Sequence, residues 1–100
     1  MSSDKIFEII EKYINSDAGI QSATEFCADF MDEFYNSQDD LESELGVDIY
    51  ELFDDINLVC DSFEPNSEIR ANDNYCIDEV MLRKRVVELY NKISVNIQNK

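Results

Sequence analysis

Apolar side chains recur at intervals of three and four residues in four segments of the chain, at about residues 3–15, 22–36, 48–63 and 78–97. This spacing places them on one side of an α-helix and leaves polar residues on the opposite side. The expected apolar faces comprise Ile6, Phe7, Ile9, Ile10, Tyr13 and Ile14; Phe26, Cys27, Phe30, Met31, Phe34 and Tyr35; Ile49, Leu52, Phe53, Ile56, Val59, Cys60 and Phe63; and Leu82, Val86, Leu89, Tyr90 and Ile93. Four such helices with modest connections predict an all-α protein, an antiparallel four-helix bundle.

Local signals predict where these helices begin and end. Ser22-Ala23-Thr24-Glu25 and Asp48-Ile49-Tyr50-Glu51 both fit the capping box, in which two side chains satisfy free backbone donors at a helix start. Pro65 is expected to stop the third helix, because proline cannot continue an α-helix. Asp78-Glu79 opens the fourth helix and places negative charge at its positive end.

The connections on either side of the third helix are polar. Residues 36–46 form an acidic connection in which Leu41 and Leu45 support at most one helical turn, and residues 66–77 form a loop rich in Asn and Asp. A chain of 100 residues, 44% of them apolar, has enough material for one core. We therefore expect a single domain over residues 1–100.

The net charge of the chain points to a protein-binding function beyond that of a generic helical bundle. The chain has 23 acidic and 8 basic residues and no histidine, for a net charge of −15. Residues 1–68 hold 19 acidic and 2 basic side chains (−17), whereas residues 69–100 hold 4 and 6 (+2). Such a field disfavours direct binding to nucleic acid or an anionic membrane and favours a basic protein partner, although acidity also serves solubility.

Site chemistry argues against an enzyme. The absence of histidine removes the usual activating base, and the sequence has no glycine-rich phosphate loop, so no catalytic residue is predicted. Glu44-Leu45-Gly46-Val47-Asp48 is similar to the stretch before the phosphopantetheine serine of acyl carrier proteins. Here Ile49 follows, and isoleucine has no hydroxyl to modify.

No metal, cofactor or disulfide framework is predicted either. The Asp and Asn clusters at residues 39–44 and 72–74 lack the glycine and glutamate register of a calcium-binding EF-hand loop. The three cysteines are odd in number and lack CxxC spacing. Cys27 and Cys60 are expected in the core, and the role of Cys76 stays open. The N-terminus lacks a signal-peptide pattern and no apolar run reaches membrane-spanning length, so a soluble cytoplasmic protein is expected.

The third helix offers a candidate binding face. At 100° per residue, its apolar side leaves Tyr50, Glu51, Asp54, Leu58 and Asp61 facing outward. One interpretation is that Tyr50 and Leu58 carry no function or pack under the 36–46 connection, since scattered exposed apolar residues are normal. The other is an apolar anchor ringed by carboxylates that docks on a basic cleft. The basic run Arg83 to Arg85 is expected to be a solvated face.

The C-terminal half, about residues 50–90, resembles the colicin D immunity protein family. The residues that carry the resemblance are Leu52-Phe53, Cys60-Asp61-Ser62-Phe63-Glu64-Pro65-Asn66, Arg70-Ala71-Asn72, Tyr75, Ile77-Asp78 and Leu82. The N-terminal half agrees only in the placement of its helices. Members of this family are four-helix bundles that neutralise a cognate tRNA-cleaving toxin domain, and relatives occur in contact-dependent growth inhibition systems.

The resemblance implies a partner and a binding face. The partner is the basic C-terminal nuclease domain of a toxin, bound by a monomer in a 1:1 heterodimer, and acidic side chains occupy the groove meant for tRNA. Asp61 and Glu64 are the acidic positions that match the family, whereas Asn66 stands where an acid fits the family's pattern. The helical face itself adds further candidate toxin-binding residues, which are Asp54, Asp55, Glu68, Tyr50 and Leu58.

Two other function classes stay open on the sequence. The first is an acidic nucleic-acid mimic or adaptor that binds a host DNA- or RNA-binding protein, and the second is an acidic structural subunit. A toxin gene beside this one favours an immunity protein, whereas co-purification with host nucleic-acid-binding proteins favours a mimic.

Overall fold

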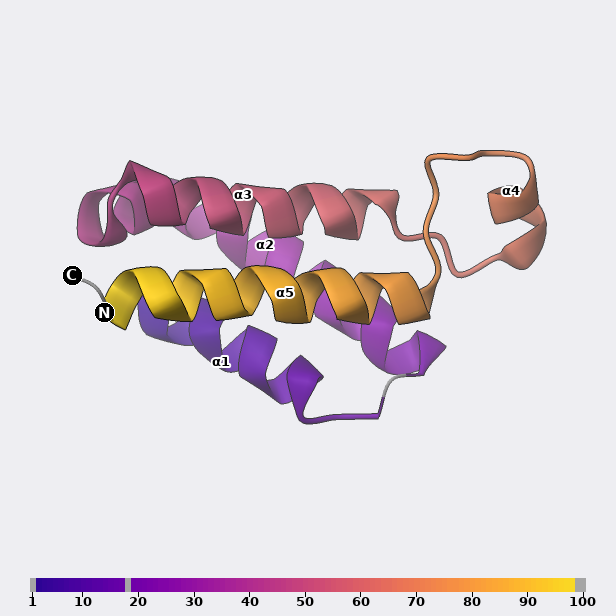
Figure 1. Cartoon of the computed structure of the whole chain (residues 1–100), viewed down its shortest axis with the longest axis horizontal. Coiled ribbons are helices and arrows are strands. Elements are labelled where there is room, and N and C mark those ends of the chain that lie inside the picture. Colours follow the sequence, from indigo (N-terminus) through magenta and orange to yellow (C-terminus); the bar gives the residue numbers. More distant parts are fainter. Residues whose placement is uncertain (1, 18, 99–100) are drawn as a thin grey trace.

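A computed structural model describes residues 2–17 and 19–98. Within these residues the chain forms five helices and no strand: α1 (Ser2–Ile14), α2 (Ile20–Leu45), α3 (Val47–Ser62), α4 (Ser67–Ala71) and α5 (Glu79–Gln98). The four long helices run alternately in opposite directions along the long axis (Figure 1). The predicted all-α bundle is therefore confirmed, and α4 is a short addition to it.

Each long helix packs mainly on its neighbours in the sequence. α1 lies on α2, α2 on α3 and α3 on α5, and smaller contacts of α5 with α1 and α2 close the bundle. The buried apolar core comprises Ile6, Ile10, Tyr13, Ala23, Phe26, Cys27, Phe30, Phe34, Leu41, Ile49, Phe53, Ile56, Cys60, Leu82, Val86 and Ile93. Cys27 and Cys60 are thus core residues, as predicted. Tyr35, expected on the apolar face of α2, is instead 75% exposed.

The second helix is much longer than the sequence pattern predicts. α2 continues from the expected end near Asn36 through the acidic segment to Leu45, so residues 36–45 belong to a helix and not to a connection. Leu41 explains the extension, because it is fully buried in the core. The buried row along the helix passes through Ser37, whose hydroxyl donates to Glu33 Oε1 at 3.0 Å. The acidic residues of this segment lie on the outer side.

A single glycine ends α2 and starts α3. Gly46 has φ 91°, a backbone conformation that residues with a side chain rarely adopt. It is the only residue between the two helices. Its amide donates to Glu42 O at 2.9 Å, which satisfies one of the free carbonyls at the end of α2. The chain therefore reverses direction at Gly46, and α2 ends nine residues later than expected.

The predicted capping boxes do not begin the helices. α2 starts at Ile20 after Gly19, and α3 starts at Val47 after Gly46, in each case without a side-chain cap. The prediction for the fourth helix is confirmed, because the Asp78 carboxylate accepts from the Met81 amide at 2.9 Å. The bounds of α1, α3 and α5 otherwise differ from the expected ranges by one residue at each end.

Aromatic contacts run along the buried side of α2. Tyr13 of α1 stacks on Phe26 with ring centroids 4.4 Å apart, Phe30 follows Phe26 at 5.6 Å, and Phe34 follows Phe30 at 5.9 Å. Phe34 then contacts Tyr50 of α3 at 5.6 Å. Because aromatic pairs add to the free energy of simple burial, this row joins α1, α2 and α3.

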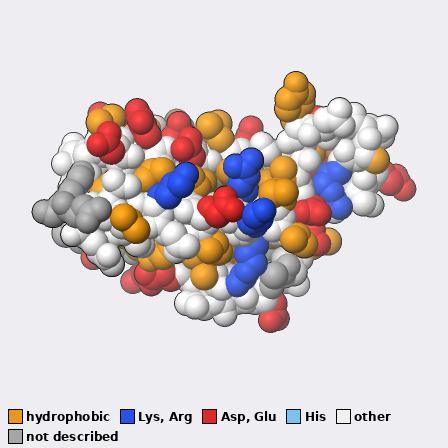
Figure 2. Space-filling view, in the orientation of Figure 1, with side chains coloured by type: hydrophobic (Ala, Val, Ile, Leu, Met, Phe, Trp, Pro, Cys, Tyr) orange, Lys and Arg blue, Asp and Glu red, His pale blue; other side chains and the backbone are white. Residues whose placement is uncertain are grey.

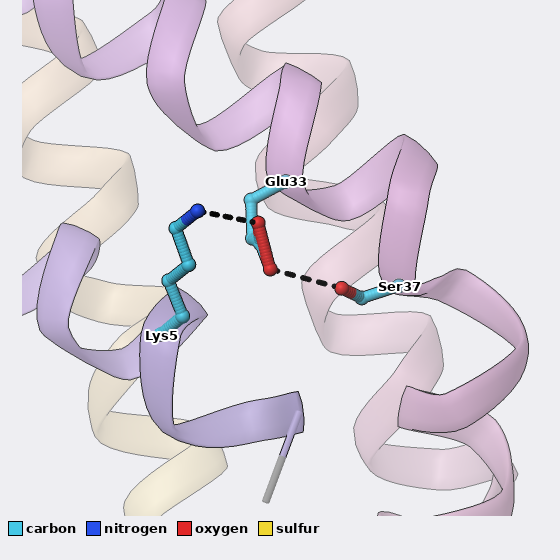
Figure 3. Close-up of polar contacts among 3 residues, drawn as sticks. All are labelled: Lys5, Glu33 and Ser37. Carbon is cyan, nitrogen blue, oxygen red and sulfur yellow. Dashed lines mark hydrogen bonds and ion pairs between the residues drawn. The ribbon is translucent and has the colours of Figure 1, made fainter.

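A polar contact at the edge of the core also ties α1 to α2. Lys5 Nζ lies 3.5 Å from Glu33 Oε2, and the other Glu33 oxygen accepts from the buried Ser37 hydroxyl (Figure 3). Lys5 is largely exposed, so the ion pair itself contributes at most about 1 kcal/mol. Its larger effect is to orient Glu33 so that the Ser37 hydroxyl keeps an acceptor inside the bundle.

The Tyr13 hydroxyl is buried without a hydrogen-bond partner among the described residues, and this leads to a stability prediction. Removing it in Tyr13→Phe keeps the stacked ring and removes an unsatisfied polar group, so at pH 7 we expect equal stability or a gain of about 1 kcal/mol. Urea denaturation measures the change. A loss above about 1 kcal/mol would show that the hydroxyl is satisfied in solution.

The same variant has a distinct alkaline signature. Burial raises the pKa of Tyr13 to about 12, although the nearby Arg83 charge lowers it. The folded protein therefore holds this proton more tightly than the unfolded chain, and the resulting stability is complete below pH 10 and lost between pH 10 and about 12. Wild type should lose stability more steeply in that window than Tyr13→Phe. The exposed Tyr35→Phe is the control and should follow wild type.

Candidate functional site

The predicted outer face of α3 is present and largely exposed. Asp54, Leu58 and Asp61 are spaced at i, i+4 and i+7 and therefore form one row along the helix. Leu58 is 57% exposed and Asp61 is exposed, whereas Asp54 is half-buried. Asp55 is exposed at the edge of this row. In the view of Figure 2, acidic side chains gather over α3 and basic side chains over α5.

Tyr50 does not face outward as predicted. It is half-buried in the seam between α2 and α3, with its ring against Phe34 and its hydroxyl donating to Gln38 Oε1 at 3.4 Å. Because α2 continues to Leu45, it covers this side of α3. Tyr50 is therefore a contact between helices, as one of the two sequence interpretations had it, and Leu58 is the exposed apolar residue of the face.

The seam around Tyr50 brings together carboxylates that the sequence had separated. Burial raises the pKa of Tyr50, and the negative charges of Asp54, Glu42 and Asp39 raise it further. Asp39 and Glu42 belong to α2, in the segment expected to be a connection. The sequence could have placed them beside α3 if the helical periodicity of α2 had been continued to Gly46.

The segment after α3 is a loop whose two ends are joined. Phe63 and Ile77 form a parallel bridge, in which Ile77 N donates to Ser62 O at 2.8 Å and Glu64 N donates to Ile77 O at 3.0 Å. We call residues 63–78 the α4 loop. The bridge keeps both ends of the α4 loop at one end of the bundle, where α3 ends and α5 begins (Figure 1).

Polar side chains build the first turn inside the α4 loop. Asn66 accepts from the amides of Glu68 at 2.9 Å and Ile69 at 3.3 Å, which caps α4. The Glu64 carboxylate accepts from the Asn66 amide at 3.1 Å. Arg70 turns toward the chain and donates to Glu64 O at 2.5 Å. The position at which the family pattern favours an acid thus holds a helix cap, while half-buried Glu64 and exposed Glu68 supply carboxylates beside it.

Arg83 is the exception to the solvated basic face expected on α5. Its guanidinium donates to Tyr13 O at 3.1 Å and to Ile14 O, which are carbonyls at the end of α1. It also lies over the Tyr13 ring, with 5.5 Å between the guanidinium carbon and the ring centre. Arg83 therefore caps α1 and stabilises the negative end of that helix. Lys84 and Arg85 are exposed, as expected.

A groove of about 270 Å³ between α1 and α2 is lined by both Lys5 and Lys12 and by glutamates such as Glu8 and Glu25. Across the described ranges, no three or more Cys, Asp and Glu side chains form a cluster suited to a metal ion. None of the helices in this part of the chain is long and apolar enough to cross a membrane.

Comparison with protein families decides which class of bundle this is. A family model described as bacterial self-protective colicin-like immunity matches residues 1–93. The chain belongs to this family. The match extends the resemblance of residues 50–90 to residues 1–93, which include the α3 face and the α4 loop. No curated protein and no solved structure matched the chain.

Membership in the colicin-like immunity family indicates what kind of functional site to expect on this protein. Immunity proteins bind and neutralise a toxin and are generally not catalysts, so the functional site is a protein-binding surface. The exposed side of α3 carries Asp54, Asp55, Leu58 and Asp61, and the α4 loop that follows α3 carries Glu64 and Glu68. We call this set the acidic face.

Proposed function

We propose that this immunity protein binds a cognate tRNA-cleaving nuclease toxin domain and blocks its basic substrate groove with the acidic face. The observation that carries the proposal is the row of outward carboxylates on α3, continued into the α4 loop, on a chain of net charge −15. A groove made for a phosphate backbone presents Lys and Arg side chains, and the same side chains pair with carboxylates. The acidic face then excludes tRNA by occupying its place.

The side of the molecule formed by α5 is less suited to this task. α5 carries the exposed basic residues Lys84, Arg85 and Lys92, which a basic groove repels (Figure 2). The outer side of α3 has no basic residue between Val47 and Ser62. The charge asymmetry of the molecule therefore orients it during approach, because opposite charges steer encounter and like charges disfavour the wrong orientation.

Leu58 supplies the apolar part of the acidic face. It is exposed between Asp54 and Asp61 in the same row, so a partner that covers it also excludes water from the flanking ion pairs. Desolvation strengthens charged contacts, which are weak when water surrounds them. Tyr50 supports the face from the α2–α3 seam. The complex is expected to contain one copy of each protein and to form in the cytoplasm, where tRNA is found.

A reconstituted cleavage assay tests the function. The cognate toxin domain, which is expected to be encoded beside this gene, is mixed with tRNA, with and without the immunity protein, and cleavage is followed on a gel. Inhibition at equimolar ratio is expected, together with a 1:1 complex by light scattering. The association rate should fall as salt rises from about 50 mM to about 500 mM, because salt screens exposed charges.

Two outcomes separate the parts of this proposal. If the toxin domain does not bind, the protein is not its immunity protein. If a stable complex forms but tRNA cleavage continues, or if tRNA and immunity protein bind the toxin together, the groove is not occluded. Catalytically inactive toxin with labelled tRNA makes the second test direct, since competition for one site predicts displacement of the tRNA.

A further inference from the structure

Tyr75, in the α4 loop, is the most exposed of the large apolar side chains that the structure describes. It is 88% exposed, whereas the core tyrosine Tyr13 is 3% exposed. Its side chain therefore contributes almost nothing to the core, and α4 in the same loop has no buried residue either. A large aromatic ring in this position exposes apolar area that a partner can cover.

The backbone on both sides of Tyr75 is held by hydrogen bonds. The Tyr75 amide donates to Asp73 Oδ1 at 2.9 Å, and the Cys76 amide donates to Asp73 O at 3.3 Å. Two residues later, Ile77 is fixed to the end of α3 by the bridge. The ring is thus presented from an ordered turn. Binding then loses little conformational entropy, since tyrosine has only two side-chain torsions.

The charges around Tyr75 define the partner that it fits. Residues 61–79 contain six acidic side chains and one basic side chain, for a net charge of −5. The basic one, Arg70, turns inward to Glu64 O. A second copy of this chain carries the same negative charge and is repelled, whereas a basic protein is attracted. The surroundings of Tyr75 therefore match the basic partner of the acidic face.

We infer that Tyr75 is the apolar anchor through which this immunity protein binds its toxin domain; this rests on the proposed function. Carboxylates pair with any phosphate-binding groove, so the acidic face alone discriminates poorly between nucleases. An aromatic ring needs a pocket of matching shape, and a wrong partner leaves it exposed or clashes with it. The α4 loop can carry this recognition because the core does not depend on the ring.

Three variants measured by calorimetry against catalytically inactive toxin domain test the inference. Tyr75→Ala is expected to weaken binding by about 30-fold or more, as for an aromatic hot spot. Tyr75→Phe should keep most of the affinity, because the ring supplies the contact. Tyr35→Ala is the matched control: it removes another exposed tyrosine, from the outer side of α2, and should change affinity less than about 3-fold. The melting temperatures of all three variants should lie within about 3 °C of wild type.

The outcomes are distinguishable. If Tyr75→Ala binds like wild type while charge reversal at Asp61 and Glu64 abolishes binding, the inference is wrong and the proposed function stands. If wild type fails to bind the toxin domain, both fail. If Tyr75→Ala instead dissociates a homodimer seen by sedimentation, or lowers the melting temperature in step with affinity, the ring serves self-association or folding and the inference is overturned.

Discussion

Charge reversal at two positions of the acidic face, in the double variant D61K/E64K, is expected to lower affinity for the toxin domain by at least about 100-fold. Close charge pairs across an interface couple by about 1.5 kcal/mol or more each, so two lost pairs amount to about 3 kcal/mol. Asp61 is exposed at the end of the α3 row, and Glu64 follows in the α4 loop. Reversal also places two lysines against a basic groove. Calorimetry and the tRNA cleavage assay both report the effect.

A matched control separates this local effect from net charge. E8K/E25K changes the net charge equally, from −15 to −11, but alters the groove between α1 and α2. It should slow association modestly and leave the dissociation rate unchanged. The milder D61N/E64Q removes both charges, and the side-chain amide that replaces the Glu64 carboxylate keeps an acceptor for the Asn66 backbone amide. If D61K/E64K binds and protects as well as E8K/E25K does, the acidic face is in the wrong place.

Truncation of the central core aromatic, in Phe30→Ala, is expected to lower the free energy of unfolding by about 3–5 kcal/mol. Phe30 is fully buried and touches both Phe26 and Phe34, so the variant leaves a cavity in the row that joins α1, α2 and α3. A domain of 100 residues has a total stability of about 5–15 kcal/mol. The variant should therefore melt more than about 12 °C lower and be partly unfolded near physiological temperature.

Two further variants of α2 serve as references for this loss of stability. Tyr35→Ala removes an aromatic ring from the exposed side of α2 and should change stability by no more than about 0.5 kcal/mol. Phe30→Leu keeps most of the apolar volume and should fall between the two. Urea denaturation of the three proteins gives the comparison. Equal stability of Phe30→Ala and Tyr35→Ala would contradict the core described above.

The end of α2 shows why helix boundaries were the weakest part of the sequence prediction. The polar run from Asn36 to Asp40 interrupts the apolar pattern, and a sequence argument ends the helix there. In the bundle, Ser37 tolerates burial because its hydroxyl donates a hydrogen bond to Glu33. Leu41 is buried against neighbouring helices. Tertiary packing thus continues a helix through residues that local pattern assigns to a connection.

The candidate site was predicted only in part for a related reason. Periodicity places Leu58 and Asp61 outward correctly, since no neighbouring helix covers that side of α3. Tyr50 has the same periodic position but lies in the seam, because whether a helix flank is covered depends on the length of the adjacent helix. The sequence indicates Tyr75 only through the family resemblance. Tyr75 is exposed in a loop whose ends are joined by the bridge between Phe63 and Ile77, a long-range contact that no local pattern contains.

The sequence by itself determined the fold class, the acidic character and the likeness to an immunity family. Each depends on composition or on repeats of three and four residues, which are local properties of the chain. The tertiary structure alone decided where α2 ends, that Arg83 caps α1, and which side chains meet solvent at the α3 face and the α4 loop. Those outcomes depend on contacts between residues far apart in the chain, whose free energy exists only once the bundle has formed.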